Sequence, residues 1–189
     1  MITYVITVSR TFPKIHKRAG QQTWFVEKIN EARMPISDEP IMGKKIHTIR
    51  ANYELWKKRF QKIEAGEACL SLRFWSGKPY RSKQVEFLRL TREDGIGIQK
   101  ITMRREELPD RILYGAQVLE EGQHIWTGEN ITRRPVDMYA RNDGLTPEDF
   151  TAWFAPTFEK ARKKYATLAD LSTAMEMEFA VIHFTKYRY

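Results

Sequence analysis

The chain has 189 residues, 42% of them hydrophobic and 12% aromatic, so it can form one well-packed domain and is too apolar for extended disorder. No apolar stretch approaches the ~20 residues of a membrane span, and the N-terminus lacks the basic-then-apolar order of a signal peptide. A single cysteine, Cys69, excludes an intramolecular disulfide framework and favours a reducing compartment. We therefore expect a cytoplasmic protein.

The net charge of +8 is concentrated in one block. Residues 43–92 hold 13 lysines and arginines against four acidic residues, whereas residues 93–189 carry a small acidic excess. A localised basic surface attracts polyanions, most often nucleic acid. The block therefore favours RNA or a nucleotide as a partner, and a solubilising surface is the alternative.

The first third of the chain predicts a strand, a basic loop, a short helix, a second strand and a longer helix, in that order. The strands are expected at 2–9 and 44–50, and the helices at 24–32 and 53–65. Asn52 is a suitable N-cap for the longer helix, and Gly66 occupies the position of a left-handed C-cap. The apolar stripe of this helix is formed by Trp56, Phe60 and Ile63.

The remainder of the chain is mostly strand, with helices near residues 136–172. Strands are expected at 67–75, 82–91, 96–104 and 179–187, with 83–104 forming a hairpin and a further possible hairpin through 122–131. A short helix at 136–142 ends before Gly144, and a longer one begins at Pro147 behind the N-cap Thr146 and continues through 158–172. We predict a single α+β domain with a mostly antiparallel sheet, curled into a barrel with flanking helices.

The order of these parts resembles the ASCH domains of the PUA-like superfamily of small β-barrels. Three motifs carry the resemblance: GKKIHTIR at 43–50, ARNDGLTPEDFTAWF at 140–154, and VIHF at 181–184. The similar parts are 43–104 and 136–189, so 1–42 is expected to be an N-terminal extension and 105–135 an insertion in the core.

The resemblance implies a cleft that binds RNA and, in some small members, amide hydrolysis on N4-acylated cytidine by a lysine, a threonine and a glutamate beside an arginine. By motif these roles fall on Lys45, Thr48, Asp143 and Arg50. Here the acid is an aspartate, one methylene shorter, and Asn-Asp-Gly is also ordinary turn chemistry. Lys45 and Thr48 would face opposite sides of a regular strand, so the chain must bend for both to reach one pocket.

His47 lies inside the same motif and is a further candidate contact for a ligand, or an acid–base group. Strand alternation favours instead that it faces away from Lys45 and Thr48. His16, His124 and His183 have no carboxylate or cysteine at metal-ligand spacing, so the sequence predicts neither a metal nor another cofactor.

The stretch RFWSGKPYRSK at 73–83 interleaves aromatic and basic side chains. Exposed aromatic rings stack on unpaired bases, while cations contact phosphates. The candidate contacts are Arg73, Lys78, Tyr80, Arg81 and Lys83. We therefore predict binding of RNA or a modified nucleoside in the basic cleft. Amide hydrolysis at the same cleft and interaction with an acidic protein partner are the alternatives.

Overall fold

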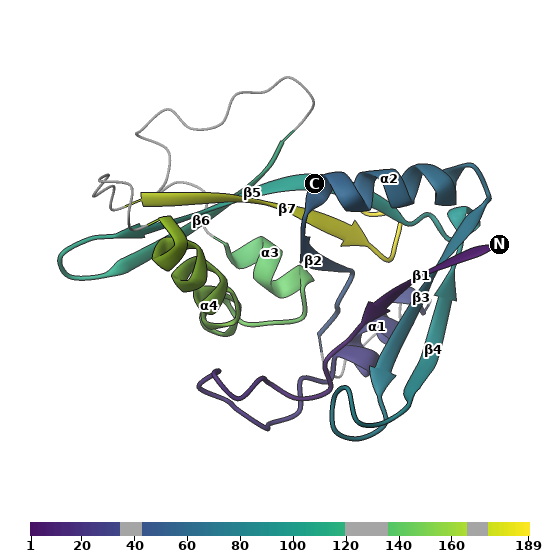
Figure 1. Ribbon diagram of the computed structural model, residues 1–189, viewed down its shortest axis with the longest axis horizontal. Helices are drawn as coiled ribbons and strands as arrows, with labels where there is room; N and C mark the ends of the chain where they lie inside the picture. The colour runs from purple at the N-terminus through teal and green to yellow at the C-terminus, as the bar shows by residue number, and fades with distance from the viewer. Residues whose placement is uncertain (35–42, 120–135, 166–173) are drawn as a thin grey trace.

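The structure, a computed structural model, describes residues 1–34, 43–119, 136–165 and 174–189. It is an α+β arrangement of two mostly antiparallel sheets and four α-helices within these residues (Figure 1). The strands described do not close into a barrel. The class predicted from the sequence is confirmed, whereas the expected barrel closure is not found in this part of the chain.

The smaller sheet has three strands in the order β1-β3-β4. These strands are β1 (Ile2–Thr7), β3 (Ala68–Trp75) and β4 (Gln84–Leu90). β1 runs parallel to β3, and β3 and β4 form an antiparallel hairpin with an irregular register between Leu72 and Arg73. The predicted N-terminal strand is thus an integral part of a sheet, although it lies outside the resemblance.

The larger sheet has four strands in the order β2-β7-β5-β6, all antiparallel. These strands are β2 (His47–Ala51), β7 (Ala174–His183), β5 (Gly97–Glu107) and β6 (Ile112–Leu119). β6 falls within the stretch that we assigned to an insertion, yet it forms a full edge of this sheet.

The predicted hairpin over 83–104 is wrong. β4 pairs with β3 in the smaller sheet, while β5 pairs with β6 and β7 in the larger one. A short 3₁₀ turn at Arg92–Asp94 separates them, with Gly95 at φ 70°. Alternating apolar residues identify each strand correctly. The same alternation is compatible with different neighbouring strands, so it does not predict which strand pairs with which.

The helices are α1 (Phe25–Arg33), α2 (Tyr53–Glu64), α3 (Asp137–Asn142) and α4 (Pro147–Tyr165). Both predicted N-caps are confirmed: the Asn52 side chain accepts from Leu55 N at 3.0 Å, and Thr146 Oγ1 accepts from Asp149 N at 3.2 Å. The possible hairpin at 122–131 and the helical continuation over 166–172 lie outside the described residues.

The core joins the helices to the sheets. The α2 stripe of Trp56, Phe60 and Ile63 is buried, as predicted. On α4, the rings of Phe154 and Phe158 pack against Phe179 of β7, with centroids 5.7 and 6.5 Å apart. These contacts fix α4 beside the larger sheet, at Phe179, which pairs with Ala51 at the end of β2.

Candidate functional site

Lys45 and Asp143 form a buried ion pair just before β2. They are joined by an isolated antiparallel bridge outside the named strands, and each side chain is at least nine-tenths buried. The Lys45 ammonium donates to the Asp143 backbone carbonyl at 2.8 Å and to its carboxylate, and it lies 4.3 Å from the centre of the Phe25 ring. The predicted lysine and acid therefore meet directly.

Burial shifts the pKa of both partners. Desolvation lowers the pKa of Lys45 to about 8, since the attraction of Asp143 only partly offsets it and the nearby cations Arg50 and Lys28 lower it further. Desolvation likewise raises the pKa of the Asp143 carboxyl, against the opposing effect of Lys45. Near neutral pH, a much larger fraction of Lys45 is therefore the neutral amine than of an exposed lysine, so Lys45 can act as a base.

Thr48 and Arg50 are two residues apart on β2 and so share one face of the strand. The Arg50 guanidinium donates to the carbonyls of Thr7, at 2.9 Å, and Ile49, at 3.3 Å. The Thr48 side chain is buried, and its hydroxyl has no hydrogen-bond partner within the residues that the structure describes. An unpartnered hydroxyl on a buried threonine is available to a ligand.

Lys45, Thr48, Arg50 and Asp143 line one cavity of about 290 Å³. Lys45 lies before the regular strand: it bridges to Asp143, whereas the pairing of β2 with β7 begins at His47. Strict strand alternation therefore does not apply between Lys45 and Thr48, and both can line the same cavity. The rest of the wall is formed by Thr7, Val8, Ser9, Phe25, Ile49, Trp153 and Phe154. A few directional polar groups among aromatic and aliphatic walls suit a small planar ligand with polar edges.

His47 does not line this cavity. It is fully buried, with Nδ1 3.1 Å from the Tyr189 hydroxyl and Nε2 4.0 Å from the Asp143 carboxylate. Burial and the neighbouring Lys45 hold its pKa well below the usual value, so the imidazole is neutral. The structure therefore places His47 behind Asp143, facing away from the cavity as strand alternation favoured.

The predicted hairpin contacts lie apart from the Lys45 cavity, at and near the β3–β4 turn. Tyr80 is 90% exposed, and its ring centroid lies 5.3 Å from that of Trp75. Lys78, Arg81 and Lys83 surround the turn, while Arg73 donates to Ser71 and pairs with Glu86 at 3.6 Å. A smaller cavity of about 240 Å³ connects the two regions, because it shares Val8 and Ser9 with the Lys45 cavity and is lined by Trp75.

Sequence reasoning missed the contribution of the N-terminal segment and α4 to the cavity wall. Thr7, Val8, Ser9 and Phe25 come from residues that we assigned to an extension. The alternation in 2–9 and the apolar positions of α1 indicate that these segments are buried. They do not indicate that the segments pack beside Lys45 and Thr48.

Within the described residues, no group of three or more histidine, cysteine, aspartate or glutamate side chains is arranged to hold a metal ion. Across the same ranges, no helix has the length and apolar character needed to cross a membrane. Cys69 is buried and unpaired. Comparison of the chain with family models, with curated proteins and with solved structures yields no match.

Proposed function

We propose that the protein is an amidohydrolase that removes an acyl group from a modified nucleobase, with N4-acylated cytidine as the substrate class. One observation carries the proposal: a buried lysine with a pKa near 8, paired with an acid, shares a cavity with an unpartnered threonine hydroxyl. These are the residue types that the ASCH resemblance assigns to hydrolysis. A lysine with a pKa near 8 can act as a base close to neutral pH, a property that a site that only binds an anion does not require.

In the proposed reaction, the neutral Lys45 amine takes the proton of the Thr48 hydroxyl while the Thr48 oxygen attacks the carbonyl carbon of the substrate amide. The carbon–nitrogen bond then breaks, and the departing amino group of the base takes the proton back from Lys45. Water, deprotonated by Lys45, hydrolyses the acyl-threonine ester, releases the acid and restores the hydroxyl.

Arg50 and Asp143 support these steps in different ways. Arg50 is fixed by two backbone carbonyls and presents a cation toward the negative charge that develops on the carbonyl oxygen. Asp143 holds the Lys45 amine through two contacts from one residue. The shorter aspartate thus reaches the lysine although the family pattern has glutamate.

We place the fold of this cavity, as part of the same proposal, in the ASCH group of the PUA-like superfamily. Support comes from the order of the elements, from the two motifs that meet at Lys45 and Asp143, and from the last strand beside β2. A cytoplasmic location fits the buried free thiol of Cys69.

Binding of RNA or a modified nucleoside without chemistry is the second candidate. It is favoured by the exposed ring of Tyr80 beside Trp75 and by the smaller cavity between this hairpin and Lys45. Tyr80→Ala would then weaken single-stranded RNA binding by about 1–3 kcal/mol, and the affinity would fall steeply with salt.

The decisive experiment follows the deacetylation of N4-acetylcytidine by the purified protein and two matched variants. Thr48→Ser keeps a hydroxyl and should keep measurable turnover. Thr48→Val keeps the shape without the hydroxyl, so it should fold normally and lose at least about 100-fold in rate. Absence of turnover by the folded wild-type protein, or equal rates in the serine and valine variants, would exclude the proposed hydrolysis. Binding of RNA or a modified nucleoside would then be the candidate function.

A further inference from the structure

A second cavity, of about 440 Å³, lies against the Asp143–Gly144 segment and shares no lining residue with the Lys45 cavity. The two are neighbours, because Lys45 donates to the Asp143 carbonyl at 2.8 Å and Lys28 donates to the next carbonyl, Gly144, at 2.7 Å. The proposed hydrolysis involves this second cavity only through the charge of Lys28, which lowers the pKa of Lys45.

The walls of the second cavity are strongly cationic. Its charged lining residues are four cations and one carboxylate: Arg18, Lys28, Lys44, Arg141 and Asp149. The cations come from the loop before α1, from α1 itself, from the segment before β2 and from α3. Four separate segments thus bring positive charge to one hollow, which focuses a positive potential there.

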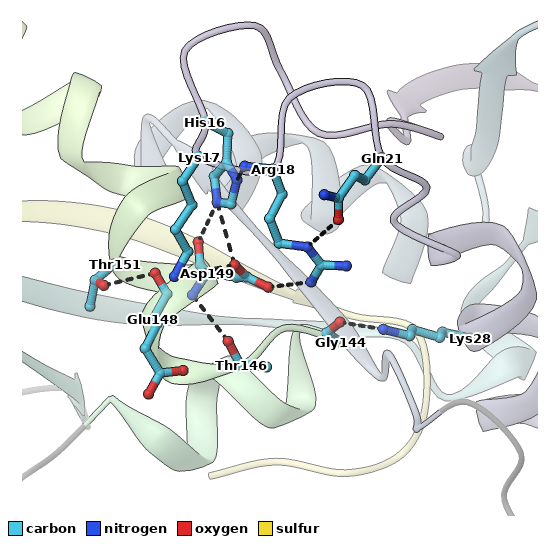
Figure 2. Close-up of polar contacts among 10 residues, drawn as sticks. All are labelled: His16, Lys17, Arg18, Gln21, Lys28, Gly144, Thr146, Glu148, Asp149 and Thr151. Atoms are coloured by element: carbon cyan, nitrogen blue, oxygen red, sulfur yellow. Dashed lines mark hydrogen bonds and ion pairs between the residues drawn. The ribbon is translucent and has the colours of Figure 1, made fainter.

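The single carboxylate is already occupied by contacts of its own (Figure 2). Asp149 accepts from Arg18 Nη1 at 2.6 Å and lies 3.7 Å from the Lys17 ammonium, while its backbone carbonyl accepts from His16 Nε2 at 3.1 Å. These contacts tie the basic loop to the start of α4. Asp149 thus shapes the cavity and pairs with Arg18 and Lys17, and its charge also acts on Lys28, so one carboxylate is shared among several cations.

Arg18 is held in place while part of its guanidinium remains available. Its Nε donates to Gln21 at 2.8 Å and its Nη1 to Asp149, which leaves Nη2 without a partner among the described residues. A guanidinium fixed in this way presents its remaining donors in a defined direction, as recognition of planar or tetrahedral oxyanions requires.

None of the other three cations forms an ion pair with a carboxylate of the described residues. Lys28 is half-buried and makes one hydrogen bond, to a carbonyl; burial and then the nearby Arg18 lower its pKa, against the opposing effect of Asp149 and Asp143. Lys44 and Arg141 are exposed, and neither has an ion-pair partner in the part of the chain that the structure describes. The cavity therefore has several unused donors.

We propose that this cavity binds a phosphoryl group, either as inorganic phosphate or as the terminal phosphate of a nucleotide. A phosphate dianion offers several strong acceptor oxygens to arginine and lysine donors, and its charge matches the excess of cations. This site goes beyond the proposed hydrolysis, because none of its cations makes or breaks a bond in that reaction.

Calorimetric titration of the full chain at low ionic strength tests the site with three probes: inorganic phosphate, cytidine 5′-monophosphate and cytidine. Arg141→Gln and Lys44→Gln should each weaken phosphate and nucleotide binding by about two- to fivefold, as expected for partly exposed charge pairs. Lys28→Met, which removes a half-buried cation, should weaken it further. Lys160→Gln, an exposed lysine on α4 outside the cavity, should change nothing.

The probes also separate the source of the phosphoryl group. Equal affinities for phosphate and the nucleotide would identify a phosphate-ion site. Tighter binding of the nucleotide than of phosphate, together with cytidine binding that Arg141→Gln does not change, would identify a nucleotide site. Absence of phosphate and nucleotide binding, or equal weakening by Lys160→Gln and Arg141→Gln, would overturn the proposal. Thr48→Val should leave phosphate binding unchanged, so the two sites can fail independently.

Discussion

The ammonium group of Lys45 donates to both the backbone carbonyl and the carboxylate of Asp143, a residue 98 positions further along the chain. The pair is buried, so each charge depends on the other for compensation. Four predictions follow from this pair and its surroundings.

The rate of N4-acetylcytidine hydrolysis should rise with pH through an apparent pKa near 8. Burial lowers the pKa of Lys45 to about 8, and only the neutral amine can accept the Thr48 proton. Only about one-tenth of the lysine is neutral at pH 7, so kcat/KM should increase roughly tenfold by pH 9. A steady-state profile from pH 6 to 9.5 measures this, and a flat profile would exclude Lys45 as the base.

Removing one partner of the ion pair should cost more stability than removing both. Lys45→Met leaves a buried carboxylate and Asp143→Asn leaves a buried ammonium, so each should lower the free energy of unfolding by about 3–5 kcal/mol. The double variant, which leaves no uncompensated charge, should lose less than either single variant. Urea unfolding of all four proteins gives the coupling energy, and strict additivity would contradict the pairing.

Gly144→Ala should be more damaging than Gly20→Ala. Both glycines have positive φ, 76° and 79°, so both substitutions strain the backbone by about 1 kcal/mol. Only at Gly144 would the new Cβ crowd neighbours, 3.1 Å from Lys45 Cβ and 3.2 Å from Lys28 Cδ, whereas Gly20 has nothing within 4 Å. Thermal unfolding should therefore show a larger decrease in Tm for Gly144→Ala than for Gly20→Ala. Equal decreases would show that the side chains of Lys45 and Lys28 move away from the new Cβ at no cost in stability.

Acid should destabilise the protein partly through His183. This residue is fully buried, and desolvation, followed by the charge of Arg188, lowers its pKa to about 3. Its contribution to stability is therefore complete above the unfolded pKa of about 6.5 and is lost as the pH falls toward 3. At pH 4.5 the loss is about 2–3 kcal/mol.

The variant His183→Phe tests this, since a phenyl ring fills the same space and takes up no proton. Its free energy of unfolding should depend less on pH between 7 and 4.5 than that of the wild type. Some dependence should persist, because the pKa of buried His47 is also lowered. Identical slopes for the two proteins would show that His183 is not neutral in the folded state.

Local signals in the sequence predicted most elements correctly. The N-caps Asn52 and Thr146 and the stripe of α2 depend on nearest neighbours along the chain, and all three are confirmed. Strand partners depend on distant segments, which explains why the hairpin at 83–104 was wrong.

The meeting of Lys45 and Asp143 could be expected only from the resemblance. Strand alternation alone would have separated Lys45 from Thr48, and the bend that brings both to one cavity depends on the bridge to Asp143. The cationic cavity was not predicted, because the meeting of Arg18 from the basic loop with Lys28 and Arg141 requires three-dimensional packing. Whether these sites act as proposed stays a prediction.

β7 lies between β2 and β5 in the larger sheet, and it is the last of the described strands in chain order. On a ribosome, β2 therefore has no lateral neighbour until residues beyond His183 have left the exit tunnel. The segment that carries Thr48 and Arg50 remains unsupported through most of translation. Support of the site is thus coupled to the emergence of β7, and a nascent chain stalled before residue 174 would lack the strand that pairs with β2.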